Sequence, residues 1–326
     1  MGVPPGCHDK KHIDMNPRIS TVLLSMVAVI LAILLFFGKG QQDLRSFQEI
    51  WDSGHIFAFW LWSHLLLTRW PALSRRPFWL QAIICMAVGL AAGFAIEAVQ
   101  GSIGRTLSYS DIRKNMVGCA MAISISAPAR KALARATRAG LQLVVIIALI
   151  VVMLPMSRAI VDDVIAWRQF PVLCSFETPF ENERWVGKAE FAIDHNIKRH
   201  GNASLKIIPK ETRRTRATLF SLGRNWDAYQ VLEFDVYNPM PSQIRLMLGV
   251  HDEIYYRDGW KGEDRFLRSF KLAHGWNHMQ IPLEDIRAAP KDHSMMMSNI
   301  REITFWAWQH ERSSVIYIDE IKLSRS

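Results

Sequence analysis

Long apolar runs dominate the first half of the chain. Hydrophobic residues fill five segments, at about 19–37, 54–70, 78–96, 112–127 and 141–155. An α-helix rises about 1.5 Å per residue, so roughly 20 apolar residues cross the hydrocarbon core of a bilayer. The pattern therefore predicts a membrane all-α bundle of about five transmembrane helices within residues 1–158.

The second half has a different pattern, in which apolar and polar residues alternate over short segments. The alternation is clearest at 231–239, 244–252, 278–283, 303–310 and 315–323. Side chains alternate between the two faces of a β-strand, so each segment predicts a strand with one buried face. We expect an all-β jelly-roll sandwich over residues 174–326, joined to the helices by a linker at 159–173.

Basic residues beside the apolar runs predict how the chain is oriented, because cytoplasmic loops carry an excess of Lys and Arg. Loops on the side of the N-terminus hold Lys10, Lys11, Arg18, Arg69, Arg75, Arg76, Arg130, Lys131, Arg135 and Arg138, whereas the opposite loops hold Lys39, Arg45, Arg105, Arg113, Lys114 and Arg158. We therefore expect a multi-pass protein of the cytoplasmic (inner) membrane. Its N-terminus is expected inside the cell and its sandwich outside the membrane.

Charge and cysteine content narrow the class further. The chain has 326 residues and a net charge of +9, but many Lys and Arg residues flank apolar runs, which favours a membrane protein over a nucleic-acid-binding one. The four cysteines, Cys7, Cys85, Cys119 and Cys174, form no CxxC metal pair and no disulfide framework within the second half. The sandwich must therefore be stabilised by an apolar core or by a metal bound through oxygen atoms.

Polar residues gather at the outer ends of three predicted spans. They are Asp52 and His55 at the second span, Glu97 and Gln100 at the third, and Asp111 and Asn115 at the fourth, with Arg105 in the intervening loop. Each pair has the spacing of one helix face, and ionised groups in a membrane normally face one another or a wet cavity. We expect one polar pocket, in which Arg105 or His55 pairs with a carboxylate. The alternative is a purely structural network, since Ser108 with Asp111 is typical of a helix-capping box.

These residues also carry a resemblance to a known family. The segments "DSGH" at 52–55, "EAVQ" at 97–100, "GR" at 104–105 and "SDIRKNMVG" at 110–118 resemble motifs of the VanZ-like membrane family, over about residues 43–126. That family usually has a Lys directly after the first Asp, where this chain has Ser53. The family is linked to resistance to a glycopeptide antibiotic of the teicoplanin type. The resemblance therefore implies a cell-envelope role without implying a reaction.

The second half resembles the galactose-binding-like jelly rolls that serve as carbohydrate-binding modules, over about residues 174–323. The segments "FETPFENERW" at 176–185, "HGWNHMQIPLEDI" at 274–286 and "YIDEIKL" at 317–323 resemble their opening, late and closing strands. Many such modules hold a structural calcium between the opening and closing strands. By that analogy Glu177 and Asp319 are candidate calcium ligands, since calcium prefers oxygen atoms. The alternative is that Asp319 only fixes the last turn.

Aromatic residues in the second half are candidates for stacking on sugar rings. The candidate sugar contacts are Trp226, Tyr255, Tyr256, Trp260, Trp306 and Trp308. In the segment 303–310, the two tryptophans share one face and the aliphatic residues share the other. The aliphatic face is the better core, which leaves Trp306 and Trp308 on the outer face of a sheet. The alternative for the whole set is burial, because most tryptophans of a sandwich belong to its core.

These features lead to three hypotheses. In the first, the chain is an envelope protein that recognises a glycan or a lipid-linked saccharide at the outer membrane surface, with membrane lipid around its helices. In the second, it is a membrane enzyme in which His55 and Glu97 act as acid and base and Asp111 orients His55. In the third, it is a non-catalytic anchor for other envelope proteins that handle polysaccharides. The sequence leaves open whether any reaction is catalysed, and it suggests no cofactor other than calcium.

Overall fold

The computed structural model describes residues 22, 24–27, 29–30, 44–102, 108–210, 215–222, 224–257, 264–309 and 312–325. The chain divides into a helical N-terminal unit, Met1–Gly40 with Trp51–Leu154, and a second unit, Gln41–Ile50 with Pro155–Ser326, which contains the β-strands. Helices α2 (Arg45–Arg69) and α6 (Arg135–Gln169) each contribute residues to both units.

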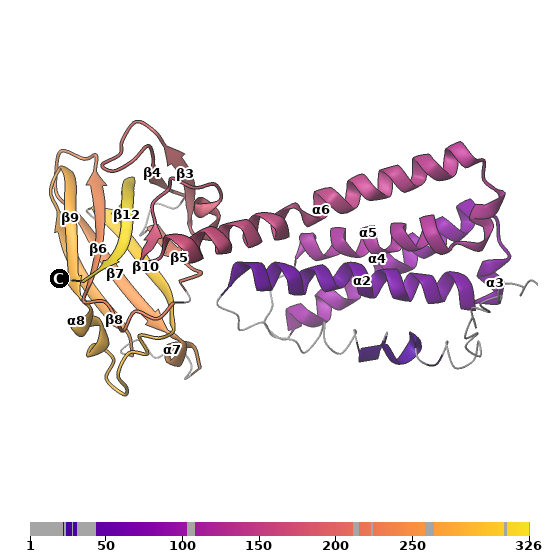
Figure 1. Cartoon of the computed structure of the whole chain (residues 1–326), viewed down its shortest axis with the longest axis horizontal. Coiled ribbons are helices and arrows are strands. Elements are labelled where there is room, and N and C mark those ends of the chain that lie inside the picture. Colours follow the sequence, from indigo (N-terminus) through magenta and orange to yellow (C-terminus); the bar gives the residue numbers. More distant parts are fainter. Residues whose placement is uncertain are drawn as a thin grey trace, which may run out of the picture. The chain divides into compact units, whose positions relative to one another are not determined.

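The helical unit is built from α2, α4 (Phe78–Ser102), α5 (Tyr109–Ser126) and the first part of α6 (Figure 1). The short helices α3 (Pro71–Ser74) and η1 (Pro128–Ala132) connect them. Ser108 is the N-cap of α5, and its hydroxyl accepts a hydrogen bond from the backbone N–H of Asp111 at 3.2 Å. This contact confirms the predicted cap.

Two helices in the described part of the chain, α4 and α6, are long and apolar enough to cross a membrane. Both expose large apolar side chains, among them Trp79 and Ile83 on α4 and Val144 and Ile150 on α6. Helices α2 and α5 do not meet the same criterion, because α5 includes Asp111, Arg113 and Lys114 and α2 is only moderately apolar. Most of the predicted span at 19–37 lies outside the described residues. The described residues thus provide two apolar helices where the sequence predicted five.

Glycines bring the three central helices into close contact. A Cβ atom added to Gly89 on α4 would lie 2.4 Å from the Cys119 sulfur on α5, and one added to Gly93 would lie 3.0 Å from Asn115 Nδ2. A Cβ added to Gly118 on α5 would lie 2.4 Å from the carbonyl oxygen of Ile56 on α2. Small residues let helix backbones approach in this way. The small-residue face at Gly89 and Gly93 therefore packs against α5, which accounts for the burial of this mildly polar helix.

Most of the predicted linker at 159–173 is helical, because α6 continues through Pro155 to Gln169. Buried contacts explain why this segment is ordered. Asp162 is buried on α6 and accepts two hydrogen bonds of 2.7 Å from the Arg184 guanidinium, which also donates to the Leu173 carbonyl at 2.9 Å. The end of α6 therefore belongs to the sandwich unit.

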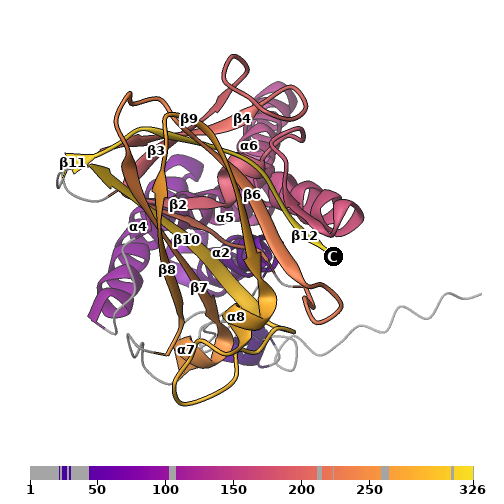
Figure 2. The same cartoon turned by 90° about the vertical axis from the view of Figure 1, so that its left-hand side faces the viewer.

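The sandwich consists of two antiparallel sheets (Figure 2). Sheet A has the order β3 (Ala189–Asp194), β4 (Ser204–Pro209), β12 (Ile316–Ser324), β6 (Val231–Asn238) and β9 (Gly275–Pro282), and β1 (Val172–Cys174) also pairs with β12. Sheet B has the order β2 (Trp185–Gly187), β5 (Thr215–Leu219), β10 (Ile300–Gln309), β7 (Ile244–Asp252) and β8 (Phe266–Leu272), and β11 (Arg312–Ser313) pairs with β10. The short helices are η2 (Glu181–Arg184), α7 (Glu253–Arg257) and α8 (Leu283–Arg287).

The apolar core lies between the two sheets and needs no disulfide. Phe234 of sheet A meets Phe305 of sheet B edge to face at 5.4 Å between ring centroids, and Phe305 lies 5.6 Å from Trp185. Cys174, the one cysteine of the second half, is buried and free. All five segments with clear alternation form strands, namely β6, β7, β9, β10 and β12. The prediction of a β-sandwich is therefore confirmed.

Candidate functional site

The outer surface of sheet B carries the best-formed candidate site of the sandwich. On β10, Ile303, Phe305 and Ala307 point into the core, while Trp306 is partly exposed on the opposite face. Strand pairing places Gly249 and His251 of β7 beside Thr304 and Glu302 of β10. We call the outer-face cluster of Gly249, His251, Glu302, Thr304 and Trp306 the Trp306 face; of these five residues Trp306 is partly exposed and the other four are buried.

The indole of Trp306 lies over Gly249 on the neighbouring strand. A Cβ atom added to Gly249 would lie 3.0 and 3.1 Å from two carbons of the six-membered ring, and 3.3 Å from the His251 ring. Glycine allows this close approach, because a larger residue would require the indole to shift by a few tenths of an ångström. The ring therefore packs against β7, and its exposed part offers an apolar contact for the C–H face of a sugar.

A buried hydrogen-bond network supports the platform. Glu302 Oε1 lies 3.0 Å from His251 Nδ1 and accepts a hydrogen bond from the Thr304 hydroxyl at 3.2 Å. Thr304 contacts the Thr218 hydroxyl at 3.1 Å, and Arg216 donates to Thr218 at 3.2 Å. Glu302 and His251 are almost fully buried although they lie on the outer face. The hydroxyl contacts hold Glu302 and Thr304 in place, whereas His251 Nδ1 and Glu302 Oε2 are buried without a hydrogen-bond partner in the described part of the chain.

The charge state of this network follows from its contacts. Burial alone would raise the pKa of Glu302. Hydrogen bonding and electrostatic attraction from His251, with smaller effects of Tyr256 and Arg216, lower the pKa by more than burial raises it, so the net pKa lies below its usual range. Burial raises the pKa of Tyr256, and the negative charge of Glu302 raises it again. Glu302 is therefore ionised and Tyr256 is neutral at neutral pH.

Acid is expected to weaken the sandwich through Glu302. Because its pKa is lower in the folded chain than in the unfolded chain, its stabilising contribution is complete above the unfolded pKa of about 4.3 and is lost as the pH falls through the folded value. Glu302→Gln should destabilise the sandwich by about 1–2 kcal/mol at pH 7 and by less at acid pH. Thermal unfolding of the wild type and of Glu302→Gln, measured from pH 7 down through about pH 4.3, gives the loss of stability in acid and the cost of the substitution. The matched change Glu190→Gln, at an exposed position of β3, should alter neither the stability nor its dependence on pH. A difference in stability between Glu302→Gln and the wild type that stays constant at all pH values would contradict the role assigned to the Glu302 carboxylate.

The other aromatic candidates occupy different environments. Trp226 is 0% exposed within the core, so its prediction as a sugar contact is wrong. Tyr255 is also buried, and its ring packs 4.7 Å from the His251 ring, which makes it a support for His251 and not a contact surface. Tyr256 is partly exposed. Trp260 and the side chain of Trp308 lie outside the described residues.

The two predicted calcium ligands hold one loop by accepting hydrogen bonds. Glu177 Oε1 accepts from the backbone N–H groups of Asn202 and Ala203 at 2.6 and 3.0 Å. Asp319 Oδ2 accepts from the backbone N–H groups of Arg199 and His200 at 2.8 and 2.9 Å. Backbone N–H groups therefore occupy one oxygen of each carboxylate and secure the segment 199–203. Asp319 Oδ1 is buried and has no hydrogen-bond partner among the described residues, and the calcium site stays a prediction.

A histidine–carboxylate cluster lies on the outer face of sheet A. His200, Asp235 and Glu320 are close enough to share a metal ion, and among the described residues they are the one group of this kind. Arg199 also contacts Asp235 at 3.0 Å, and Lys322 contacts Glu320 at 3.3 Å. These cations already neutralise both carboxylates, so the arrangement is that of an ion-pair network.

Three of the predicted polar residues of the helical unit, His55, Asp111 and Asn115, lie close together in the structure. His55 donates from Nδ1 to Asn115 Oδ1 at 3.0 Å, and its Nε2 lies 4.0 Å from Asp111 Oδ2. Glu97 Oε2 accepts from the backbone N–H of Ser108 at 2.8 Å. The buried side chains of this group are His55, Glu97, Gln100, Asp111 and Asn115. Asp52 is partly exposed. Arg105 lies outside the described residues.

Buried atoms without partners distinguish this cluster from a simple cap. Within the described residues, Glu97 Oε1, Asp111 Oδ1 and Asn115 Nδ2 are buried and have no hydrogen-bond partner. Unpaired buried polar groups are costly, which sets these three atoms apart from the satisfied groups of an ordinary helix cap. Lys114, which the sequence pattern treated as a flanking charge, is also buried on this side of α5. Its position three residues after Asp111 is the signal that would have placed it on the same helix face.

Comparisons with known proteins concern the fold alone. No family model matches the sequence, so the VanZ-like resemblance rests on its motif residues, and no curated protein matches either. A family 11 carbohydrate-binding module from Clostridium thermocellum, in complex with a β-1,3-1,4-mixed-linked tetrasaccharide, is 17% identical with a TM-score of 0.35, over 48% of this chain and 95% of that chain. A family 30 carbohydrate-binding module of a cellulosomal cellulase from the same organism is 16% identical with a TM-score of 0.35, over 43% and 88%. An exo-β-agarase is 16% identical with a TM-score of 0.38, over 48% and 25%.

Proposed function

We propose that the chain is a membrane-anchored glycan-binding protein and that the Trp306 face is its binding surface. The observation that carries this proposal is the Trp306 indole, which rests over Gly249 beside the fixed polar network of His251 and Glu302. Stacking on the indole and hydrogen bonds to sugar hydroxyls are the two interactions that a glycan requires. The ligand in this proposal is an envelope or exported polysaccharide.

The helical unit is proposed to hold the sandwich at the outer surface of the cytoplasmic membrane. The apolar helices α4 and α6 and the excess of basic residues on the side of the N-terminus support this placement. In the full proposal α2, α5 and the segment 19–37 also cross the membrane, which gives the five spans of a VanZ-like bundle. Helices α2 and α5 would then be shielded from lipid by their neighbours.

Glycan binding by the full chain, purified in detergent and applied to an array of envelope polysaccharides, tests the proposal. Trp306→Ala should weaken binding about 10- to 100-fold, since removing a central stacked ring costs about 1.4–2.7 kcal/mol. Trp276→Ala is the matched control, because Trp276 is a partly exposed tryptophan that packs 5.3 Å from Tyr237 on sheet A. It should bind as the wild type does. Absence of binding to every polymer, or equal effects of the two changes, would refute the proposal.

A second candidate function belongs to the polar cluster of the helical unit. Its three unpartnered buried atoms support binding of a polar headgroup, such as that of a lipid-linked saccharide. The Nδ1 hydrogen bond to Asn115 leaves His55 Nε2 directed toward Asp111, an arrangement that also suits acid–base chemistry. Glu97→Gln separates the alternatives. An enzyme would lose turnover of a lipid-linked sugar while the sandwich still binds glycan, whereas an anchor would change only in abundance.

A further inference from the structure

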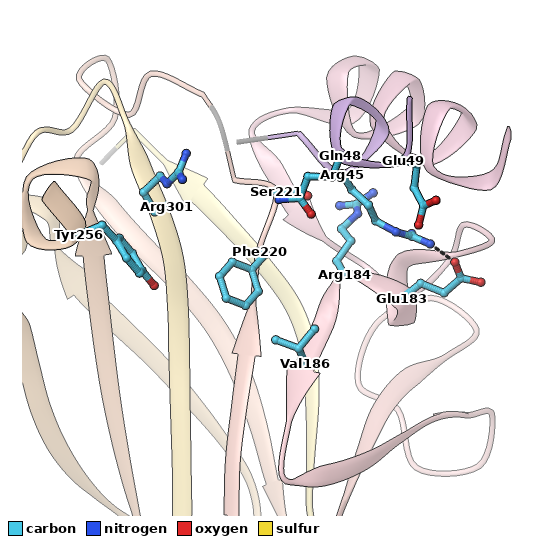
Figure 3. Close-up of a pocket in the computed structure, with 10 residues that line it drawn as sticks. All are labelled: Arg45, Gln48, Glu49, Glu183, Arg184, Val186, Phe220, Ser221, Tyr256 and Arg301. Carbon is cyan, nitrogen blue, oxygen red and sulfur yellow. Dashed lines mark hydrogen bonds and ion pairs between the residues drawn. The ribbon is translucent and has the colours of Figure 1, made fainter. Parts of the chain in front are cut away.

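A pocket of about 370 Å³ lies within the sandwich unit, next to sheet B (Figure 3). The start of α2 forms one side of it with Arg45 and Gln48, and Tyr256 and Arg301 form the opposite side. Val186 of β2 and Phe220 lie between these two sides. Its volume is at the lower end of the range of roughly 300–1,000 Å³ for small-ligand pockets.

The pocket has one apolar wall that nothing in the described chain covers. The Val186 side chain is 49% exposed, and Phe220 stands beside it. Gln48 and the hydroxyl-bearing residues Ser221 and Tyr256 also line the pocket. A pyranose ring has this same division, with apolar C–H faces and a rim of hydroxyl groups.

Each arginine that lines the pocket pairs with a carboxylate. Arg45 forms an ion pair with Glu183, Arg184 with Asp162, and Arg301 with Glu253 at 3.1 Å. Glu49 adds one further carboxylate to the lining. A phosphate or a uronic acid would have to displace a carboxylate from its arginine. A neutral sugar can instead accept hydrogen bonds from guanidinium groups and donate to carboxylates without disturbing the pairs.

Side-chain contacts link the pocket to the Trp306 face. Tyr256 lines the pocket, and its side chain interacts with the Glu302 carboxylate. Glu302 contacts His251, whose ring lies beside the Trp306 indole over Gly249. Val186 likewise pairs with Thr218, a member of the network below the platform. These contacts and pairings make the pocket a neighbour of the Trp306 face on sheet B.

Building on the proposed function, we infer that this pocket is a second subsite of the glycan-binding surface and accepts a neutral sugar residue. Trp306 holds one sugar, and the pocket holds another sugar of the same chain. The first turn of α2 thereby takes part in glycan recognition, and the ligand is an uncharged polysaccharide.

Binding of fragments of increasing length tests this inference. The probe is a ladder of neutral fragments, from disaccharide to hexasaccharide, of the polysaccharide that the array selects, titrated calorimetrically into the full chain. Affinity should rise about tenfold once a fragment is long enough to reach from Trp306 into the pocket. Val186→Glu, which adds a carboxylate to the apolar wall, should remove this rise and leave the affinity for short fragments unchanged. Met240→Glu is the matched control at an exposed apolar residue outside the pocket, and it should retain the rise.

The outcomes separate the inference from the proposed function. If Trp306→Ala abolishes binding but Val186→Glu keeps the dependence on length, the subsite is overturned and the proposed function stands. If Trp306→Ala binds as the wild type does, both are overturned. A carboxylated hexasaccharide of the same sequence should bind more weakly than the neutral one, and tighter binding would contradict the assignment of a neutral ligand.

Discussion

Replacing Asp162 with alanine is expected to lower the free energy of unfolding of the sandwich by about 3–5 kcal/mol. The Arg184 guanidinium is buried and donates two hydrogen bonds of 2.7 Å to the Asp162 carboxylate. Without Asp162, a charged group stays in the interior with only the Leu173 carbonyl and the more distant charges around it. Thermal or denaturant unfolding of the full chain, followed by the β-sheet signal in circular dichroism, measures the loss.

The control for this prediction is Asp227→Ala. Asp227 also pairs with an arginine, Arg287, at 3.0 Å, but both side chains are exposed, so the change should cost at most about 1 kcal/mol. Exchanging both buried partners, as Asp162→Ala with Arg184→Met, should recover part of the stability, because no unpaired charge is then left inside. Equal effects of Asp162→Ala and Asp227→Ala would show that α6 is not fixed by this ion pair.

Gly118→Val is expected to destabilise the helical unit by about 3 kcal/mol, the upper part of the usual range for overpacking. The atoms that an added side chain would meet are backbone atoms of α2, namely the Ile56 carbonyl oxygen at 2.4 Å and the Trp60 nitrogen at 2.9 Å. Backbone cannot rotate away, so α5 and α2 must separate. This separation should also break the contact between His55 and Asn115, which joins the same two helices.

Thermal unfolding in detergent, followed with a thiol-reactive dye, measures this loss of stability, because the buried Cys85 and Cys119 react with the dye once the helical unit unfolds. Gly101→Val is the matched control, because nothing lies within 4 Å of a Cβ atom at Gly101. It should leave the unfolding temperature unchanged or raise it slightly, since valine is a better helix former than glycine. Tolerance of Gly118→Val would contradict the close packing of α5 on α2.

The sequence predicts much of the fold because periodicity is a local property. Alternation placed Ile303, Phe305 and Ala307 in the core and Trp306 outside, as the structure has them. The same pattern could not predict that β7 pairs with β10, because the paired residues lie 48 to 63 positions apart in the sequence. Gly249 and His251 were missed for this reason, since neither is conspicuous until Trp306 lies beside it.

Helical spacing predicted the polar cluster in the same local way. His55, Asp111 and Asn115 meet because each lies on the inward face of its helix. The extent of α6 was misjudged because a proline and a change in composition suggested the end of a helix. What continues that helix is the buried pair of Asp162 with Arg184, a contact between residues 22 positions apart that no periodic pattern reveals.

The most direct measurement is an experimental structure of the full chain with a bound neutral oligosaccharide. A sugar ring stacked on the Trp306 indole, with its neighbour directed toward Tyr256 and Val186, is the expected result. A saccharide bound instead beside Trp276 and Tyr237 on the outer face of sheet A would contradict the account.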